Sequence, residues 1–393
     1  MPIILFAIFI DLLGFGIIVP ILPFLTLKYG GDAMVGTALV SIYSLMTFLA
    51  GPLWGRLSDR IGRRPALAAT FLGSTIAYIA LAFSSNLIML FVARAMSGMM
   101  AGNVGIAMAA MSDLTDESNR GRAMGLIGAT FGLGFAFGPF IGGLLGSVGG
   151  EPNIFLPALA AASFSCTAMF LTARFMPETS KHRSGEDDEE SAAETKKPLP
   201  HWSVVLKSPG QLALFAMFFI TAVGQSICFA ITPFWAQATL GWDQVKVGFL
   251  LAGVGLCVAA IQSLAIGPLF KKFGELKSLM IGASAHLIGC TILLFGPGTV
   301  TTALIAFPLV MSGLTVSFPA LNSILSKRAD KRLQGTALGF SSGMSALGRV
   351  FGPLAGGMAF AGYSANSPFF VVASTGAIAF VWALTEVRRL NGA

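Results

Sequence analysis

Long apolar runs separated by short polar turns dominate the pattern of the chain. A helix that crosses a bilayer needs about 20 predominantly apolar residues. Twelve runs approach or exceed that length, at residues 3–25, 34–55, 65–84, 86–112, 122–147, 153–175, 210–236, 246–270, 278–296, 300–325, 335–361 and 366–386. The pattern therefore predicts an all-α membrane protein with twelve transmembrane helices.

The composition excludes an ordinary soluble domain. Of the 393 residues, 55% are hydrophobic and only 11% are charged, whereas about a quarter of the residues in soluble domains are charged. The four cysteines lie inside apolar runs and lack the spacing of metal ligands. We therefore expect neither a metal site nor a disulfide framework, and we interpret the cysteines as packing residues.

Lysine and arginine are distributed unequally between the two sides that the twelve spans define. Of the 25 such residues, 21 fall on one side, Lys28 and Lys246 fall on the other, and Arg94 and Arg349 lie within spans. Because cytoplasmic loops carry the excess of Lys and Arg, we expect both termini in the cytoplasm. The net charge of +7 is then a signal of orientation in a lipid bilayer, and no nucleic-acid partner is expected.

The sequence contains an internal repeat. Residues 121–143 and 335–357 share a glycine and proline pattern in which five residues recur after 214 positions. This predicts two homologous six-helix bundles, at residues 1–175 and 209–393, joined by a polar cytoplasmic linker at residues 176–208. Two parallel repeats are a known plan of transporters, in which a site near the membrane midplane is exposed alternately to each side.

Small residues and prolines of this repeat form a candidate contact between the halves. Small residues four apart let helices approach closely, and proline removes a backbone hydrogen bond and permits a kink. We expect the following residues to shape that contact: Gly134, Gly138, Pro139, Gly142, Gly143, Gly352 and Pro353.

Ionisable residues near the middle of predicted spans are functional candidates, because each costs about 2.5 to 3.5 kcal/mol on insertion scales. Asp11 is the only carboxylate well inside a span. If a proton and the substrate compete for one buried carboxylate, the movement of protons across the membrane is coupled to the movement of the substrate. We therefore assign Asp11 and Arg94 to proton coupling. The alternative is a fixed structural ion pair between these two residues.

Three further polar residues are assigned to the substrate cavity: Gln225, His286 and Arg349. His286 could instead be a satisfied hydrogen-bonding residue on an apolar helix. Arg349 could bind an anionic substrate or balance the charge of Asp11, and the sequence leaves both roles open.

The stretch GRLSDRIGRRP, at residues 55–65, concentrates four arginines and an aspartate in one short turn. The arginines suit a cytoplasmic location. Gly55 lets its helix approach a neighbour closely, and Asp59 can meet the positive N-terminus of another helix. The turn is therefore a candidate conformational gate.

Several motifs resemble those of one transporter family. GRLSDRIGRRP resembles the loop signature of the major facilitator superfamily between helices two and three, and LFVARAMSG (residues 90–98) resembles its fourth-helix arginine motif. GFAFGPFIGG (residues 134–143) is similar to the fifth-helix signature of its antiporters, and DLLGFGIIVPILP (residues 11–23) to the first-helix pattern of its drug:proton antiporter branch with twelve helices. SDRIGRRP, AFSS, MSDLTDESNR, FGLGFAFGP and the LGW and VGF segments of residues 240–249 resemble tetracycline efflux proteins most closely.

The resemblance implies the major facilitator fold over nearly the whole chain. It also implies that the second helix closes on the eleventh, with Asp59, Arg63 and Asp113 forming a latch that is closed when the cavity faces outward. Two positions depart from the tetracycline efflux proteins, because their acidic residues of helices three and nine fall on Ala77 and His286. We therefore expect a substrate other than tetracycline, such as an amphiphilic drug or metabolite.

The leading hypothesis is a proton-driven antiporter that exports a drug-like or amphiphilic small molecule by alternating access. It would act as a monomer in the bacterial inner membrane, driven by the proton gradient and without a cofactor. The alternative is a proton-coupled symporter that imports a small organic anion attracted by the arginines at the midplane. No catalytic triad, metal-ligand spacing or phosphate loop occurs in the sequence, so we expect no enzyme.

Overall fold

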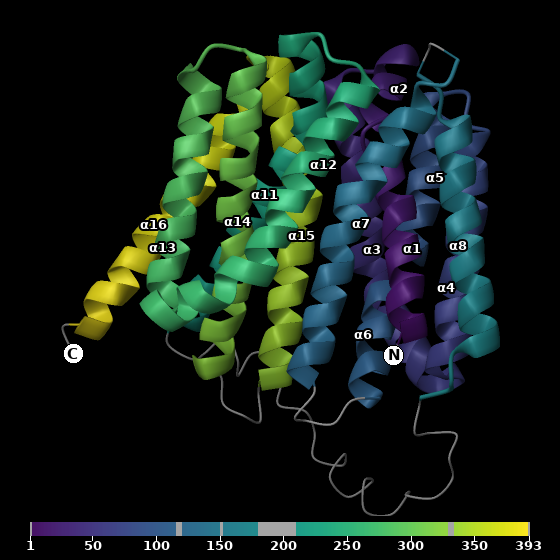
Figure 1. Ribbon diagram of the computed structural model, residues 1–393, viewed down its shortest axis with the longest axis horizontal. Helices are drawn as coiled ribbons and strands as arrows, with labels where there is room; N and C mark the ends of the chain where they lie inside the picture. Colours follow the sequence, from purple (N-terminus) through teal and green to yellow (C-terminus); the bar gives the residue numbers. More distant parts are fainter. Residues whose placement is uncertain (1, 115–119, 150–151, 180–209, 329–333, 392–393) are drawn as a thin grey trace, which may run out of the picture.

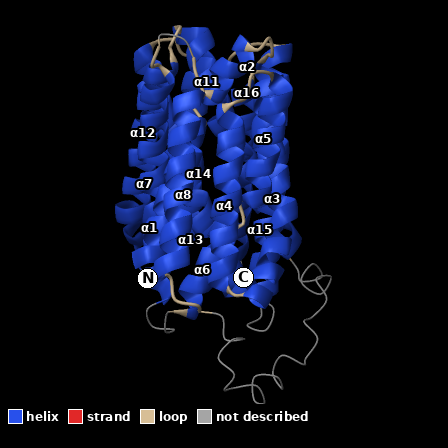
Figure 2. Ribbon diagram, turned by 90° about the vertical axis from the view of Figure 1, so that its right-hand side faces the viewer, coloured by secondary structure: helices blue, strands red, loops and turns tan. Residues whose placement is uncertain are grey.

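The computed structural model describes residues 2–114, 120–149, 152–179, 210–328 and 334–391. These residues form helices joined by turns, with no strand among them (Figure 2). The first half contains α1 (Pro2–Ile18), α2 (Leu22–Lys28), α3 (Ala33–Ile61), α4 (Arg63–Ala82), α5 (Leu87–Met100), α6 (Asn103–Asp113), α7 (Arg120–Gly146) and α8 (Phe155–Phe175). The second half contains α11 (Gln211–Leu240), α12 (Gln244–Ala260), the π-helical segment η2 (Ile261–Ala265), α13 (Ile266–Phe295), α14 (Val300–Arg328), α15 (Gln334–Gly362) and α16 (Pro368–Asn391).

Helices cover the predicted apolar runs, but some boundaries differ from the prediction. The first run is divided between α1 and α2 by a turn at residues 19–21, and the fourth is divided between α5 and α6 at residues 101–102. The eighth and ninth runs are joined through α13, in which Gly274 alone is non-helical, with φ of 74°. Within the described ranges, nine helical segments are long and apolar enough to cross a membrane. The all-helical class is thus confirmed, whereas the count of twelve spans stays a prediction.

The two halves share one packing scheme. Helix α1 packs against α7 and α8, and α11 packs in the same way against α15 and α16. Helix α4 packs on α8 as α13 packs on α16. Each half has buried apolar clusters of its own, around Ile8 and Phe71 in the first and around Phe215 and Phe218 in the second. Figure 1 shows the helices of the two halves on opposite sides of the molecule.

The halves meet through two helix pairs, α3 with α15 and α7 with α12. The start of α1 and the end of α16 lie at one end of the molecule, which we call the terminal end (Figure 1). Helix α2 lies at the opposite end, which we call the α2 end.

Side-chain caps fix several helix starts at the α2 end. The side chains of Asp32, Asn86 and Asp243 accept hydrogen bonds from the backbone N–H of Val35, Met89 and Lys246, at 2.9, 3.0 and 2.9 Å. Such caps satisfy backbone donors that the helix itself leaves free. Most of the predicted linker, residues 180–209, lies outside the described residues.

Candidate functional site

Asp11 lies in the middle of α1 and is only 8% exposed. Its carboxylate accepts a hydrogen bond from the Ser165 hydroxyl of α8 at 3.0 Å and another from the side-chain amide of Asn103. Both donors are neutral and both belong to the first bundle. The carboxylate is therefore held inside that bundle by two hydrogen bonds.

The break between α5 and α6 positions Asn103, which sequence reasoning missed. At the break, a β-carbon on Gly102 would overlap the Trp54 side chain, and the indole N–H of Trp54 donates to the Met99 carbonyl at 2.7 Å. Helix α6 then begins at Asn103, whose side chain is buried. A buried asparagine after a glycine in an apolar run is a signal that could have identified this partner of Asp11.

Arg94 is 1% exposed, in α5, and lies over aromatic rings. Its guanidinium carbon is 4.5 Å from the ring centre of Tyr43 and 5.8 Å from that of Phe15, within the range of cation–π attraction. Gly98, one turn further along α5, allows the close approach of α3, because a β-carbon there would overlap the Tyr43 carbonyl. The Nε and Nη1 atoms of Arg94 have no hydrogen-bond partner among the described residues.

The structure contradicts a fixed ion pair between Asp11 and Arg94. Within the described ranges, ion pairs join Arg63 to Asp59 and Asp113, Lys327 to Glu275, and Arg328 to Glu386. Asp11 is bonded to neutral donors, and Arg94 is stacked on Tyr43. The two residues assigned to proton coupling therefore share one bundle without pairing, and Tyr43 is close enough to interact electrostatically with both.

Arg349 of α15 places a second guanidinium group at the contact between the halves. Its neighbour Gly348 packs against α11, where a β-carbon would lie 2.7 Å from the β-carbon of Ala222. The Arg349 side chain itself is exposed and interacts electrostatically with Tyr43 of α3. Tyr43 is thus a neighbour of both midplane arginines, and sequence reasoning missed it.

The other two cavity residues differ from each other in their placement. Gln225 of α11 is half-buried, and its side chain makes no hydrogen bond within the described part of the chain. His286 is 1% exposed, and its Nε2 atom is 2.8 Å from the Val372 carbonyl of α16. It borders a void of about 10 Å³ that is lined by residues of the second bundle. Packing between α13, α14 and α16 buries the ring, so His286 is a hydrogen-bonded residue inside the second bundle in this structure, and its assignment to the substrate cavity stays a prediction. Ala77 is likewise fully buried in α4.

At the α2 end, one glycine from each repeat makes the contact between the halves. A β-carbon on Gly143 of α7 would lie 2.6 Å from the Gln244 carbonyl of α12, and one on Gly357 of α15 would lie 3.1 Å from Cα of Met34 in α3. Gln244 also donates its side-chain amide to the Gly146 carbonyl at 3.0 Å. The halves are therefore tightly packed at this end.

The remaining members of the repeat pack mainly within their own half. β-Carbons on Gly134, Gly138 and Gly142 would meet α1, and one on Gly352 would meet α11. Pro139 and Pro353 lie inside α7 and α15, and Gly248 of α12 approaches the Pro139 carbonyl, at 2.6 Å from an added β-carbon. The repeat thus positions the first helix of each bundle as well as the contact between the bundles.

At the terminal end, α3 and α15 stand apart. A β-carbon on Gly55 of α3, or on Gly339 or Gly343 of α15, would meet no atom within 4 Å among the described residues. A cavity of about 380 Å³ lies between the two helices, lined by Phe48, Thr336, Gly339, Phe340, Gly343, Met344 and Leu347. The expected close contact of Gly55 with a neighbouring helix is therefore not made in this conformation.

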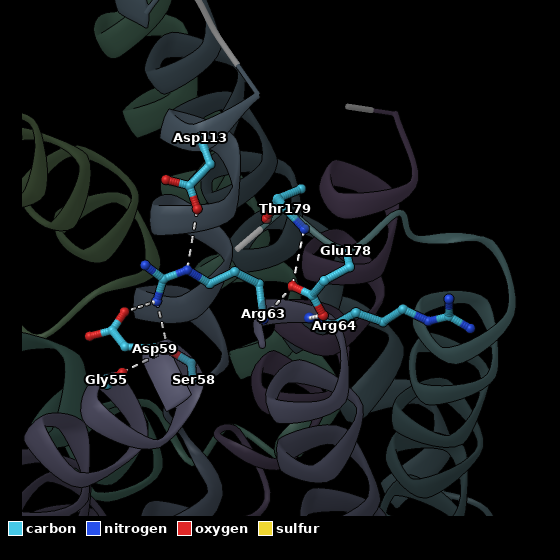
Figure 3. A network of polar contacts seen from close by, with 8 residues as sticks. All are labelled: Gly55, Ser58, Asp59, Arg63, Arg64, Asp113, Glu178 and Thr179. Atoms are coloured by element: carbon cyan, nitrogen blue, oxygen red, sulfur yellow. Dashed lines mark hydrogen bonds and ion pairs between the residues drawn. The ribbon is translucent and has the colours of Figure 1, made fainter. Parts of the chain in front are cut away.

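The residues assigned to the gate form a polar network at the terminal end (Figure 3). Arg63 bonds to Asp59 at 2.6 Å through Nη1 and to Asp113 of α6 at 3.3 Å through Nε. The same Nη1 donates to the Ser58 hydroxyl at 2.7 Å. Asp59, Arg63 and Asp113 are thus brought together, whereas Gly55 faces open space.

Glu178 completes this network and was not predicted. Its carboxylate accepts hydrogen bonds from the backbone N–H groups of Arg63 at 2.7 Å and Arg64 at 3.3 Å, at the start of α4 (Figure 3). A negative charge is favourable at a helix N-terminus. Gly62, just before the helix, has φ of 101° and leaves room for this carboxylate, which a β-carbon would overlap.

Comparisons with known proteins agree with this arrangement. A model of the Major Facilitator Superfamily matches residues 4–353. The tetracycline resistance protein of class H from Pasteurella multocida is 32% identical, with 90% of this chain and 86% of that protein covered. The class C protein from Escherichia coli is 30% identical, with 90% and 87% covered. The crystal structure of the human organic anion transporter MFSD10 is similar in fold, with a TM-score of 0.72, 22% identity, and 97% and 98% of the two chains covered.

Proposed function

The chain belongs to the Major Facilitator Superfamily, and we propose that it is a proton-coupled antiporter that exports a drug-like or amphiphilic small molecule by alternating access. The relatives named as tetracycline resistance proteins support drug efflux at the level of the family. In this proposal, twelve spans form two six-helix halves that work as a monomer. The terminal end faces the cytoplasm of a bacterium, consistent with the excess of Lys and Arg there.

The buried carboxylate of Asp11 is the observation that carries the proposal. It is the one carboxylate near the middle of the described helices, and it has neutral hydrogen-bond donors and no cation partner. Such a group can accept and release a proton as its surroundings change. Proton binding at Asp11 and substrate binding at the nearby arginines would then be linked through Tyr43.

The test is transport by purified protein in liposomes with an imposed pH gradient. Tetracycline, the lipophilic cation ethidium and 2-naphthylacetate serve as probes of three charge types. We expect the gradient to drive at least one probe, and Asp11→Asn to abolish the dependence on the gradient while retaining binding, because asparagine keeps a hydrogen-bond acceptor but cannot carry the proton.

Ser165→Ala is the matched control, because it removes one neutral donor and leaves the carboxylate. We expect this variant to keep transport coupled to the gradient. Undiminished coupling in Asp11→Asn, or failure of the gradient to drive any of the three probes, would contradict the proposal.

A second candidate is a symporter that imports a small organic anion. The observation that favours it is the presence of two guanidinium groups, Arg94 and Arg349, with no carboxylate paired to either among the described residues. The direction of transport separates the two candidates. In membrane vesicles of right-side-out and inverted orientation, export predicts gradient-driven accumulation only in the inverted vesicles, and import predicts it only in the right-side-out vesicles.

A further inference from the structure

We propose that the substrate is an aromatic organic anion, whose acidic group is held by Arg349 and Arg94 beside the ring of Tyr43. The inference deepens the proposed function and rests on it for the location of the site. It concerns the charge of the substrate, which neither the family nor the relatives settle for this chain.

The balance of charge at the site favours an anion. Near the middle of the described helices, Arg94 and Arg349 supply two positive charges and Asp11 supplies one negative charge. The Asp11 carboxylate is engaged by Ser165 and Asn103 inside the first bundle. A cationic substrate would therefore meet two guanidinium groups and no free carboxylate, which is unfavourable in a region of low dielectric.

The missing hydrogen bonds of the Arg94 side chain also favour an anionic substrate. Its side chain is 1% exposed, yet Nε and Nη1 are without partners among the described residues. Buried polar groups are normally hydrogen-bonded, and leaving a charged donor unsatisfied is costly. A carboxylate is a strong, charge-assisted acceptor for the N–H groups of a guanidinium. An acidic substrate group that accepts from Nε or Nη1 would thus satisfy a donor that the protein leaves open.

The aromatic side chains beside the arginines favour a substrate that carries an aromatic ring. The rings of Phe15 and Tyr43 lie 5.0 Å apart between centres, and Phe15 packs against an apolar cluster to which both halves contribute. The Tyr43 ring covers Arg94, at 4.5 Å, and the Tyr43 phenol is close enough to Arg349 of α15 to interact with it electrostatically. Movement of this ring would open Arg94 to a bound anion and provide a face for the aromatic body to stack on. Tyr43 is therefore placed to select the substrate.

The experiment measures equilibrium binding to purified protein without a gradient, so that its result does not depend on transport. The probes share a naphthalene ring: 2-naphthylacetate, 2-naphthylacetamide and (2-naphthylmethyl)trimethylammonium. We expect the affinity order carboxylate, then amide, then ammonium. Arg349→Gln should weaken carboxylate binding by about tenfold or more, the effect of losing a charged hydrogen bond, and leave amide binding unchanged.

Three further variants serve as controls for the binding experiment. Arg174→Gln removes an arginine at the end of α8, outside the site, and should change none of the three affinities. Tyr43→Phe keeps the ring and should preserve carboxylate binding, whereas Tyr43→Ala should weaken it. Each variant is compared with the unaltered protein for monodispersity and helical content before binding is measured.

The proposal is overturned if the ammonium probe binds more tightly than the carboxylate, if none of the three probes binds, or if Arg349→Gln lowers all three affinities equally. Anion binding without gradient-driven transport would contradict the proposed antiporter and leave the anion site standing. Gradient-driven transport of ethidium with no affinity for naphthylacetate would contradict the anion site and leave the proposed antiporter standing.

Discussion

The two ends of the contact between the halves differ in the kind of residue that lies there. At the α2 end, Gly143 and Gly357 bring backbones together, and Gln244 adds one hydrogen bond. At the terminal end, Gly55 and Gly339 face open space, and the nearby side chains are the charged residues Asp59 and Arg63. Helices α3 and α15 are thus in close contact at the α2 end and apart at the terminal end, beside a polar network. This is the arrangement expected of a transporter whose cavity is accessible from the terminal end.

The largest effect is expected from filling the closed end. Gly143→Val would place side-chain atoms against the Gln244 carbonyl, which lies 2.6 Å from an added β-carbon. Overpacking of this kind costs about 1–3 kcal/mol, which corresponds to a shift of about fivefold to 150-fold between two conformations. We expect gradient-driven transport in liposomes to fall by that factor. Gly253→Val in α12, where nothing lies within 4 Å, is the control, and equal losses in the two variants would show that helix propensity is responsible.

A smaller effect is expected from filling the open end. Gly55→Val meets no atom in this conformation, so thermal stability of the resting protein should stay unchanged. Transport should nevertheless fall by about tenfold, because closure of the terminal end would require the same 1–3 kcal/mol of overpacking. Gly55→Ala should show a graded, weaker loss. Unimpaired transport in Gly55→Val would mean that this glycine never approaches another helix.

The smallest effect is expected from the helix caps at the two ends. Glu178→Ala removes the carboxylate that accepts from the start of α4 at the terminal end, and Asp243→Ala removes the cap of α12 at the α2 end. Each should lower stability by about 1 kcal/mol, seen as a similar decrease of Tm. Only Glu178→Ala should also slow transport, by about threefold, since its partners Arg63 and Arg64 belong to the gate. Equal transport in the two variants would separate Glu178 from gating.

The class of fold was predictable because its signals are local in the sequence. Run length shows that helices are long enough to span a bilayer, and the repeat after 214 residues shows two related halves. The same repeat predicted that Gly143 would lie at the contact. Its counterpart Gly357 was not singled out, although it makes the equivalent contact with α3. The exact breaks, such as that between α5 and α6, depend on packing against Trp54 and could not be read from periodicity.

The sequence identified which charged residues belong to the site, but it did not identify the residues that they contact. Asp11 and Arg94 stand out because charge is rare in a span, but the sequence gives no distance between them, and their pairing was left open. Asn103, Ser165 and Tyr43 decide that question, and each is an ordinary polar or aromatic residue in an apolar helix. His286 was placed at the cavity because histidine is polar, whereas its direction is set by the Val372 carbonyl. Tertiary contacts therefore determine which conspicuous residues work together.

The central claim is that the two ends of the contact between α3 and α15 alternate. The most direct test is to measure spin-label distances by electron–electron double resonance, with one pair of labels at positions 32 and 364 for the α2 end and a second pair at positions 56 and 342 for the terminal end. The exposed cysteines, Cys166 and Cys257, are first replaced by serine. Without a gradient, we predict a short distance at the α2 end and a long one at the terminal end, and addition of a transported probe with a pH gradient should lengthen the first as it shortens the second. Distances that change in the same direction at both ends, or at neither, would contradict the account.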